Sequence, residues 1–122
     1  MSKLKKIMII DDSKVSRMMI SSIIKNNHTG IELLEASDGK EAIDLSTRND
    51  IDFFSVDLNM PGIDGLELIS ILKKQFPVSK FALLTANIQD TVKENARNIG
   101  AKCFNKPISE DNINNMMAYF YD

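Results

Sequence analysis

This chain of 122 residues contains only one cysteine and one histidine, and it contains no tryptophan. A single cysteine excludes an internal disulfide, and Cys103 and His28 are too few to build a zinc site from sulfur and nitrogen ligands. Any metal site in this chain would therefore use oxygen ligands.

Long apolar runs and a one-sided charge are also absent. No apolar run approaches the roughly 20 residues that span a bilayer, and residues 1–6 lead into a strand pattern without the features of a signal peptide. The 15 basic and 17 acidic residues are interspersed and leave no basic stripe. We expect a cytoplasmic protein that neither inserts into a membrane nor binds nucleic acid.

Strand and helix patterns alternate five times along the chain. Apolar runs predict strands at residues 7–10, 31–35, 51–56, 81–84 and 101–105, each followed by a segment with helical periodicity. This order is typical of an α/β protein with a doubly wound, five-stranded parallel sheet. The length suits one hydrophobic core, so residues 1–122 are predicted to form a single domain.

Apolar stripes in the helices are interpreted as core rather than as binding surface. In the first helix, Val15, Met18, Met19, Ile23 and Ile24 are predicted to lie on one buried side.

Acidic residues stand at the ends of two predicted strands. Asp11 and Asp12 directly follow the first strand, and Asp57 ends the third. Carboxyl ends of parallel strands meet at one edge of the sheet, where two carboxylates about 4 Å apart repel by roughly 4 kcal/mol at an effective dielectric of 20. Capping a helix would use only one acid. Three carboxylates without histidine or cysteine favour a Mg²⁺ site.

Thr85 and Lys106 end the fourth and fifth strands at the same edge. Taken singly, such residues are usually a turn former and a solvated charge. Together, a hydroxyl and an ammonium group suit the oxygens of a phosphoryl group, and Asp57 can act as the nucleophile that forms an aspartyl-phosphate.

These motifs resemble the receiver domain of two-component response regulators, the CheY-like family, over essentially the whole chain. The resemblance rests on residues 9–13, residues 57–65, Thr85-Ala86 and Lys106-Pro107. It implies a flavodoxin-like (βα)5 fold, and a receiver spanning residues 1–122 without an output domain. It also implies a histidine kinase as phosphodonor and a monomer that binds a protein target through its fourth helix, fifth strand and fifth helix.

The resemblance also implies the role of each acid. Asp57 would be the phosphoacceptor and a ligand of Mg²⁺. Asp12 would bind the metal directly, Asp11 would act through water, and the backbone carbonyl of Asn59 would be a further ligand.

The remaining motif positions would handle the phosphoryl group. Thr85 and Lys106 would hold its oxygens and start the conformational switch, and the Lys106-Pro107 peptide would be cis. Asn59 and Asn87 stand where family members tune the lifetime of the phosphate.

One position departs from the family pattern. Receivers usually carry an aromatic residue three positions before the last lysine, where this chain has Cys103. Phe104 is one position closer to Lys106, and strand side chains alternate between faces. Phe104 is favoured as the switch residue if the strand is shortened or bulged, and Cys103 is the alternative.

Several functions fit these residues. The favoured one is a stand-alone, chemotaxis-type regulator that promotes only its own phosphoryl transfer and dephosphorylation. A phosphorelay intermediate or phosphate sink would have the same site. A haloacid-dehalogenase-type phosphatase would place an Asp-x-Asp nucleophile at the first strand, and a flavin carrier would need a phosphate-binding loop there instead of two acids.

Overall fold

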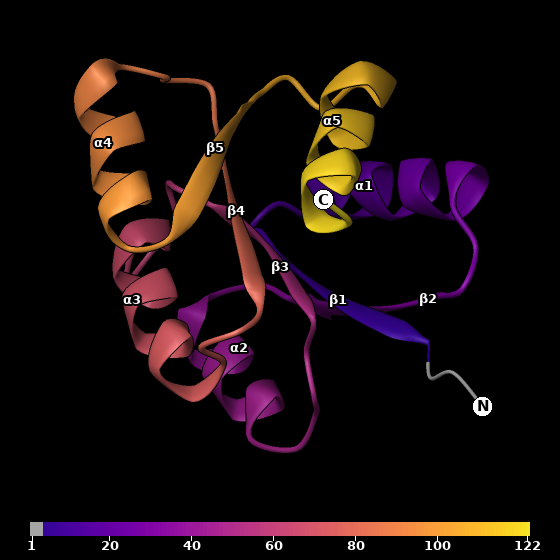
Figure 1. The fold of residues 1–122 in the computed structure, drawn as a ribbon, viewed down its shortest axis with the longest axis horizontal. Helices are drawn as coiled ribbons and strands as arrows, with labels where there is room; N and C mark the ends of the chain where they lie inside the picture. Colours follow the sequence, from indigo (N-terminus) through magenta and orange to yellow (C-terminus); the bar gives the residue numbers. More distant parts are fainter. Residues whose placement is uncertain (1–3) are drawn as a thin grey trace.

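The computed structural model describes residues 4–122, in which five strands and five helices alternate (Figure 1). The strands are β1 (Lys5–Ile10), β2 (Ile31–Ala36), β3 (Phe53–Asp57), β4 (Lys80–Thr85) and β5 (Ala101–Asn105). The helices are α1 (Lys14–Asn27), α2 (Gly39–Ser46), α3 (Gly65–Gln75), α4 (Asp90–Asn98) and α5 (Glu110–Phe120). None of these helices is long and apolar enough to cross a membrane.

All neighbouring strands pair in parallel, in the order β2-β1-β3-β4-β5. Helices α1 and α5 cover one face of the sheet, and α2, α3 and α4 cover the other (Figure 1). The predicted fold class is confirmed. In this topology the carboxyl ends of all five strands lie at one edge of the sheet, which is where the site is built.

The sheet separates two hydrophobic cores, each containing a stacked aromatic pair. Phe54 and Phe81 stack on the side of α2, α3 and α4 with ring centroids 4.7 Å apart, and Phe53 stacks on Phe120 of α5 at 4.8 Å. Residues 7–10 of β1 are almost fully buried, as expected for a central strand with helices on both faces.

The buried face of α1 differs from the prediction. Ile20 and Ile24 pack on the sheet, whereas the side chains of Val15, Met18 and Met19 are exposed, with relative exposures of 66%, 57% and 44%. The cause is helical phase, because nine residues make two and a half turns and place Val15 and Ile24 on opposite sides. An apolar patch therefore lies on the surface.

Helix α4 is the least anchored helix of the described chain. The other four helices begin with an N-cap side chain that accepts a backbone N–H, but Gln89 before α4 makes no such bond. Such a cap is worth about 1 kcal/mol. Ala96 is the only residue of α4 that is buried. A single buried residue and the absence of a side-chain cap are features of helices with low local stability.

Candidate functional site

The strand ends bring three carboxylates and one amino group together. The carboxylates belong to Asp11 and Asp12 after β1 and to Asp57 at the end of β3, and one oxygen of each lies within 4.8 Å of the others. Lys106 follows β5, and its Nζ lies 3.1 Å from Asp57 Oδ1 and 3.3 Å from Asp11 Oδ2. One cation thus faces three anions.

Burial differs among the acids. Asp11 and Asp57 are almost completely buried, with relative exposures of 1% and 5%, whereas Asp12 is exposed. Burial raises the pKa of Asp57, and the charge of Asp11 raises it further; the bond and charge of Lys106 oppose the shift without cancelling it. Burial lowers the pKa of Lys106, but the two carboxylates outweigh burial and raise it overall. The site therefore retains excess negative charge that a cation would neutralise.

The loop that carries Asp11 is held by the first turns of α1. Asp11 Oδ1 accepts the backbone N–H of Ser13 at 2.9 Å. Arg17 donates from its guanidinium to the Asp11 carbonyl at 2.6 Å, and its Nε lies 3.0 Å from a carboxylate oxygen of Glu35 at the end of β2. Sequence reasoning did not identify Arg17 and Glu35. The sequence pattern that could have identified them is an arginine that follows two acids by one to two helical turns, together with a third acid near the end of the neighbouring strand.

Two features fix Asp57 at the end of β3. The backbone N–H of Asn59 donates to its carboxylate and lowers its pKa, although the net shift stays upward. A Cβ on Gly65 would stand 2.5 Å from the Asp57 carbonyl oxygen, so only glycine permits α3 to begin so close to the strand. The side chain of Asn59 is exposed at the rim of the site.

On the other side of the site, Thr85 ends β4 with a relative exposure of 1%. Its hydroxyl oxygen accepts the backbone N–H of Asn87 at 3.0 Å, and its carbonyl accepts the N–H of Lys106 at 3.0 Å. The side chain of Asn87 is exposed. The peptide between Lys106 and Pro107 is cis, as predicted.

Strand β5 is neither shortened nor bulged at the two candidate switch residues. It pairs residue by residue with β4, with Leu83 opposite Cys103 and Thr85 opposite Asn105. Because side chains alternate between faces, Cys103 shares the face of Thr85. In this register Phe104 does not share the face of Thr85, and which of the two residues acts as the switch stays a prediction.

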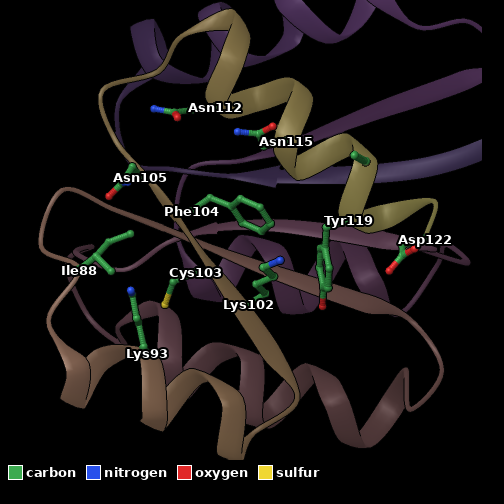
Figure 2. Close-up of a pocket in the computed structure, with 11 residues that line it drawn as sticks. Ile88, Lys93, Lys102, Cys103, Phe104, Asn105, Asn112, Asn115, Tyr119 and Asp122 are labelled. Carbon is green, nitrogen blue, oxygen red and sulfur yellow. The ribbon is translucent and has the colours of Figure 1, made fainter.

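The two side chains diverge toward different helices (Figure 2). Cys103 points to α4, where its sulfur lies 3.9 Å from the Val92 carbonyl. Phe104 is buried toward α5, with its ring centroid 5.6 Å from that of Tyr119. Cys103 thus lies on the sheet face of Thr85 and contacts the backbone of α4.

A sequence model of the response regulator receiver domain matches residues 7–118. The chain belongs to this family. It is a CheY-like receiver domain, and receiver domains are the phosphoacceptor signalling domains of two-component systems.

Curated relatives of this receiver include short and long proteins. It is 31% identical over 109 residues to the chemotaxis protein CheY of Listeria monocytogenes, covering 88% of this chain and 91% of that protein. It is 28% identical to sporulation initiation phosphotransferase F of Bacillus subtilis, covering 88% and 86%. It is 33% identical over 81 residues to the nitrate/nitrite response regulator protein NarP of Escherichia coli, covering 66% of this chain but 38% of that protein.

Among solved structures, the chemotaxis response regulator CheY4 of Vibrio cholerae has the same fold as this receiver. The TM-score is 0.86 at 24% sequence identity, and the match covers 97% of this chain and 99% of that one.

The three carboxylates of this receiver suit the metal that receiver domains bind through acidic residues, which is Mg²⁺. Hard oxygen ligands, one of them on an exposed side chain that leaves room for metal-bound water, are what this small, partly hydrated cation requires.

Proposed function

We propose that this receiver accepts a phosphoryl group from a histidine kinase on Asp57, in a Mg²⁺-dependent reaction, and then binds a downstream protein as a monomer. The role is of the chemotaxis type. The observation that carries the proposal is the buried Asp57 carboxylate, held between two further acids and the Lys106 amino group.

The reaction is a phosphoryl transfer between two side chains. A carboxylate oxygen of Asp57 attacks the phosphorus of a phosphohistidine, the P–N bond breaks, and its electron pair returns to the imidazole nitrogen. When bound by Asp11, Asp12, Asp57 and the Asn59 carbonyl, Mg²⁺ would supply positive charge near the phosphoryl oxygens. Lys106 exchanges its carboxylate partner for one of those oxygens.

Thr85 and the two asparagines complete the proposed site. The Thr85 hydroxyl turns from the Asn87 N–H to donate to a phosphoryl oxygen, which moves the end of β4. Hydrolysis of the aspartyl-phosphate needs water to approach past the exposed side chains of Asn59 and Asn87. Neither amide can act as a general base, so these residues tune the lifetime by shielding and orienting that water.

The exposed apolar patch of α1, formed by Val15, Met18 and Met19, is the proposed docking site of the kinase. It lies within two turns of Asp12, and a protein phosphodonor must contact the surface beside the acceptor. Exposed apolar side chains grouped on one helix are typical of protein interaction sites, and methionines adapt their shape to a partner.

The proposed signal travels through Cys103 to the face made by α4, β5 and α5. Cys103 shares a sheet face with Thr85 and contacts the backbone of α4. A shift of Thr85 is therefore transmitted to the helix that lacks a side-chain N-cap and has one buried residue. Phosphorylation acts by favouring one of two positions of this helix.

A second role is supported by the likeness to sporulation initiation phosphotransferase F, over 86% of that protein's length. In this role the receiver would pass its phosphoryl group to another histidine, as a phosphorelay intermediate. The same residues would carry out the transfer, so the partner distinguishes the two roles.

Incubation with acetyl phosphate and Mg²⁺, followed by intact-mass measurement, tests the proposal. We expect one phosphate adduct in the wild type, none in Asp57→Asn, and none in the wild type with EDTA. An adduct of equal yield in Asp57→Asn would contradict the assignment. Turnover of a generic phosphomonoester would instead indicate the phosphatase alternative.

A further inference from the structure

Two hollows meet at Cys103 on the face made by α4, β5 and α5. The outer hollow, of about 570 Å³, lies along β5 and α5 and includes Ile88, Phe104 and Tyr119 in its wall (Figure 2). The inner hollow, of about 420 Å³, lies between α4 and β5. Lys93, Lys102 and Cys103 line both hollows, so the two form one depression.

The inner hollow has a cationic lining. Lys93 and Arg97 of α4 and Lys102 of β5 line it, and none of its described lining residues is acidic. The acid in the wall of the outer hollow is Asp122, at the far end of α5, where its backbone carbonyl accepts a bond from Lys80. The depression therefore carries positive charge at its centre.

Lys102 is exposed, and its amino group lies near two aromatic rings. Its Nζ lies 5.6 Å from the ring centroid of Phe104 and 5.8 Å from that of Tyr119, within the range of cation–π attraction. At an exposed site such an attraction is worth about 0.5–1 kcal/mol and favours this position of the amino group. The amino group stays accessible to an anionic partner.

Apolar surface lies beneath these charges. Cys103 is partly exposed between the hollows, and Ala101 lines the inner one. A thiol is much smaller than an aromatic ring, and Phe104 is directed to α5, so this chain leaves open the space beside Cys103. An apolar floor under three cations matches a large apolar side chain flanked by carboxylates.

We propose that the output partner binds this depression through an acidic segment that inserts one aromatic side chain beside Cys103. Its carboxylates contact Lys93, Arg97 and Lys102, and the aromatic side chain fills the space left by the cysteine. This inference takes the output face from the proposed function and adds the chemistry of the partner.

The absence of tryptophan from the chain permits a direct binding assay. The probe is a synthetic 15-residue peptide with one central tryptophan flanked by glutamates, and the matched probe has glutamine at every glutamate. The full chain, treated with beryllofluoride and Mg²⁺, is titrated into each peptide while the tryptophan emission is recorded. We expect a saturable blue shift with the acidic peptide and at least tenfold weaker binding of the neutral one.

Two variants locate the binding. The triple variant Lys93→Gln, Arg97→Gln, Lys102→Gln is expected to bind the acidic peptide at least tenfold more weakly, and Cys103→Phe, which fills the depression, should weaken it similarly. The matched control neutralises two lysines and one arginine that are exposed elsewhere, Lys25→Gln, Lys40→Gln and Arg48→Gln, and should change the affinity less than twofold.

Three outcomes would overturn the inference: equal binding of the neutral peptide, wild-type affinity in the triple variant, or an equal loss in the control. The triple variant changes exposed side chains only and is expected to fold. It therefore still tests the inference if Cys103→Phe does not fold. The phosphate adduct, measured on the same proteins with acetyl phosphate and Mg²⁺ and without beryllofluoride, separates the two proposals. Lost peptide binding in a phosphorylated variant supports the inference, whereas a wild type that takes up no phosphate refutes the proposed function itself.

Discussion

Replacing the Asp57 carboxylate by an amide is expected to stabilise the metal-free protein. At 3.1 Å, the attraction between Asp57 and Lys106 is roughly 5 kcal/mol at an effective dielectric of 20. Repulsion between Asp57 and Asp11, whose oxygens lie within 4.8 Å, is roughly 3.5 kcal/mol, and that from the exposed Asp12 is reduced by solvent. Together these two charge terms leave a net attraction of at most about 2 kcal/mol, which repulsion from Asp12 reduces further.

Desolvation then decides the sign. A buried carboxylate costs several kcal/mol and a buried amide roughly 1–3, so Asp57→Asn should raise the free energy of unfolding by about 2 kcal/mol. This direction agrees with the pKa of Asp57, which burial raises above 3.8. Because the folded-state pKa is raised, the cost is present at neutral pH and disappears as the pH falls through the folded-state value.

Urea unfolding in EDTA at neutral pH measures the effect, with Asp50→Asn as a control for an exposed acid. For a slope of about 2 kcal/mol per molar, the midpoint of Asp57→Asn should lie about 1 M higher, and that of the control should not move. Saturating Mg²⁺ should reduce the advantage by about 1.4 kcal/mol if the variant binds the metal tenfold more weakly. A variant less stable than the wild type in EDTA would refute the reasoning.

Three further predictions concern neighbouring residues. Calorimetric titration should show a larger loss of Mg²⁺ affinity in Asp12→Ala than in Asp11→Ala, because Asp11 is already bound by Lys106 and by a backbone N–H; equal losses would contradict this. Lys106→Met should lose the NMR shift changes that beryllofluoride induces in β5 and α5. In the wild type, the pKa of Lys106 is raised in the folded state, so the stability that its charge provides at neutral pH should disappear as the pH rises above about 10.5. Phe104→Ala should lower the free energy of unfolding by about 3 kcal/mol without uncoupling the response, whereas Cys103→Ala should cost less than about 1 kcal/mol and reduce it; the reverse pattern would restore Phe104 as the switch.

The fold was predictable because its signals are local. Residues 7–10 and 81–84 are uninterrupted apolar runs, and the structure buries them in central strands. The acids at the strand ends were equally visible, since parallel topology converts strand-end positions into a single place in space.

Two features were not predictable, because they depend on contacts between distant segments, whereas a third, the exposed side of α1, was predictable but missed. Counting apolar residues in α1 did not reveal that Val15 lies opposite Ile24, although helical phase does. The contact of Arg17 with the Asp11 carbonyl and with Glu35 requires α1 and β2 to be positioned first. The direction of Phe104 depended on the register of β5 against β4, and the sequence left two registers open.

Borohydride trapping tests the central claim most directly. Borohydride reduces an aspartyl-phosphate to homoserine, so treatment after incubation with acetyl phosphate and Mg²⁺ marks the acceptor permanently for peptide mass spectrometry. We predict homoserine at position 57, and none when EDTA is present. Homoserine at position 11 or 12, or at no position in a protein that has gained phosphate, would contradict the assignment of Asp57 as the phosphoacceptor.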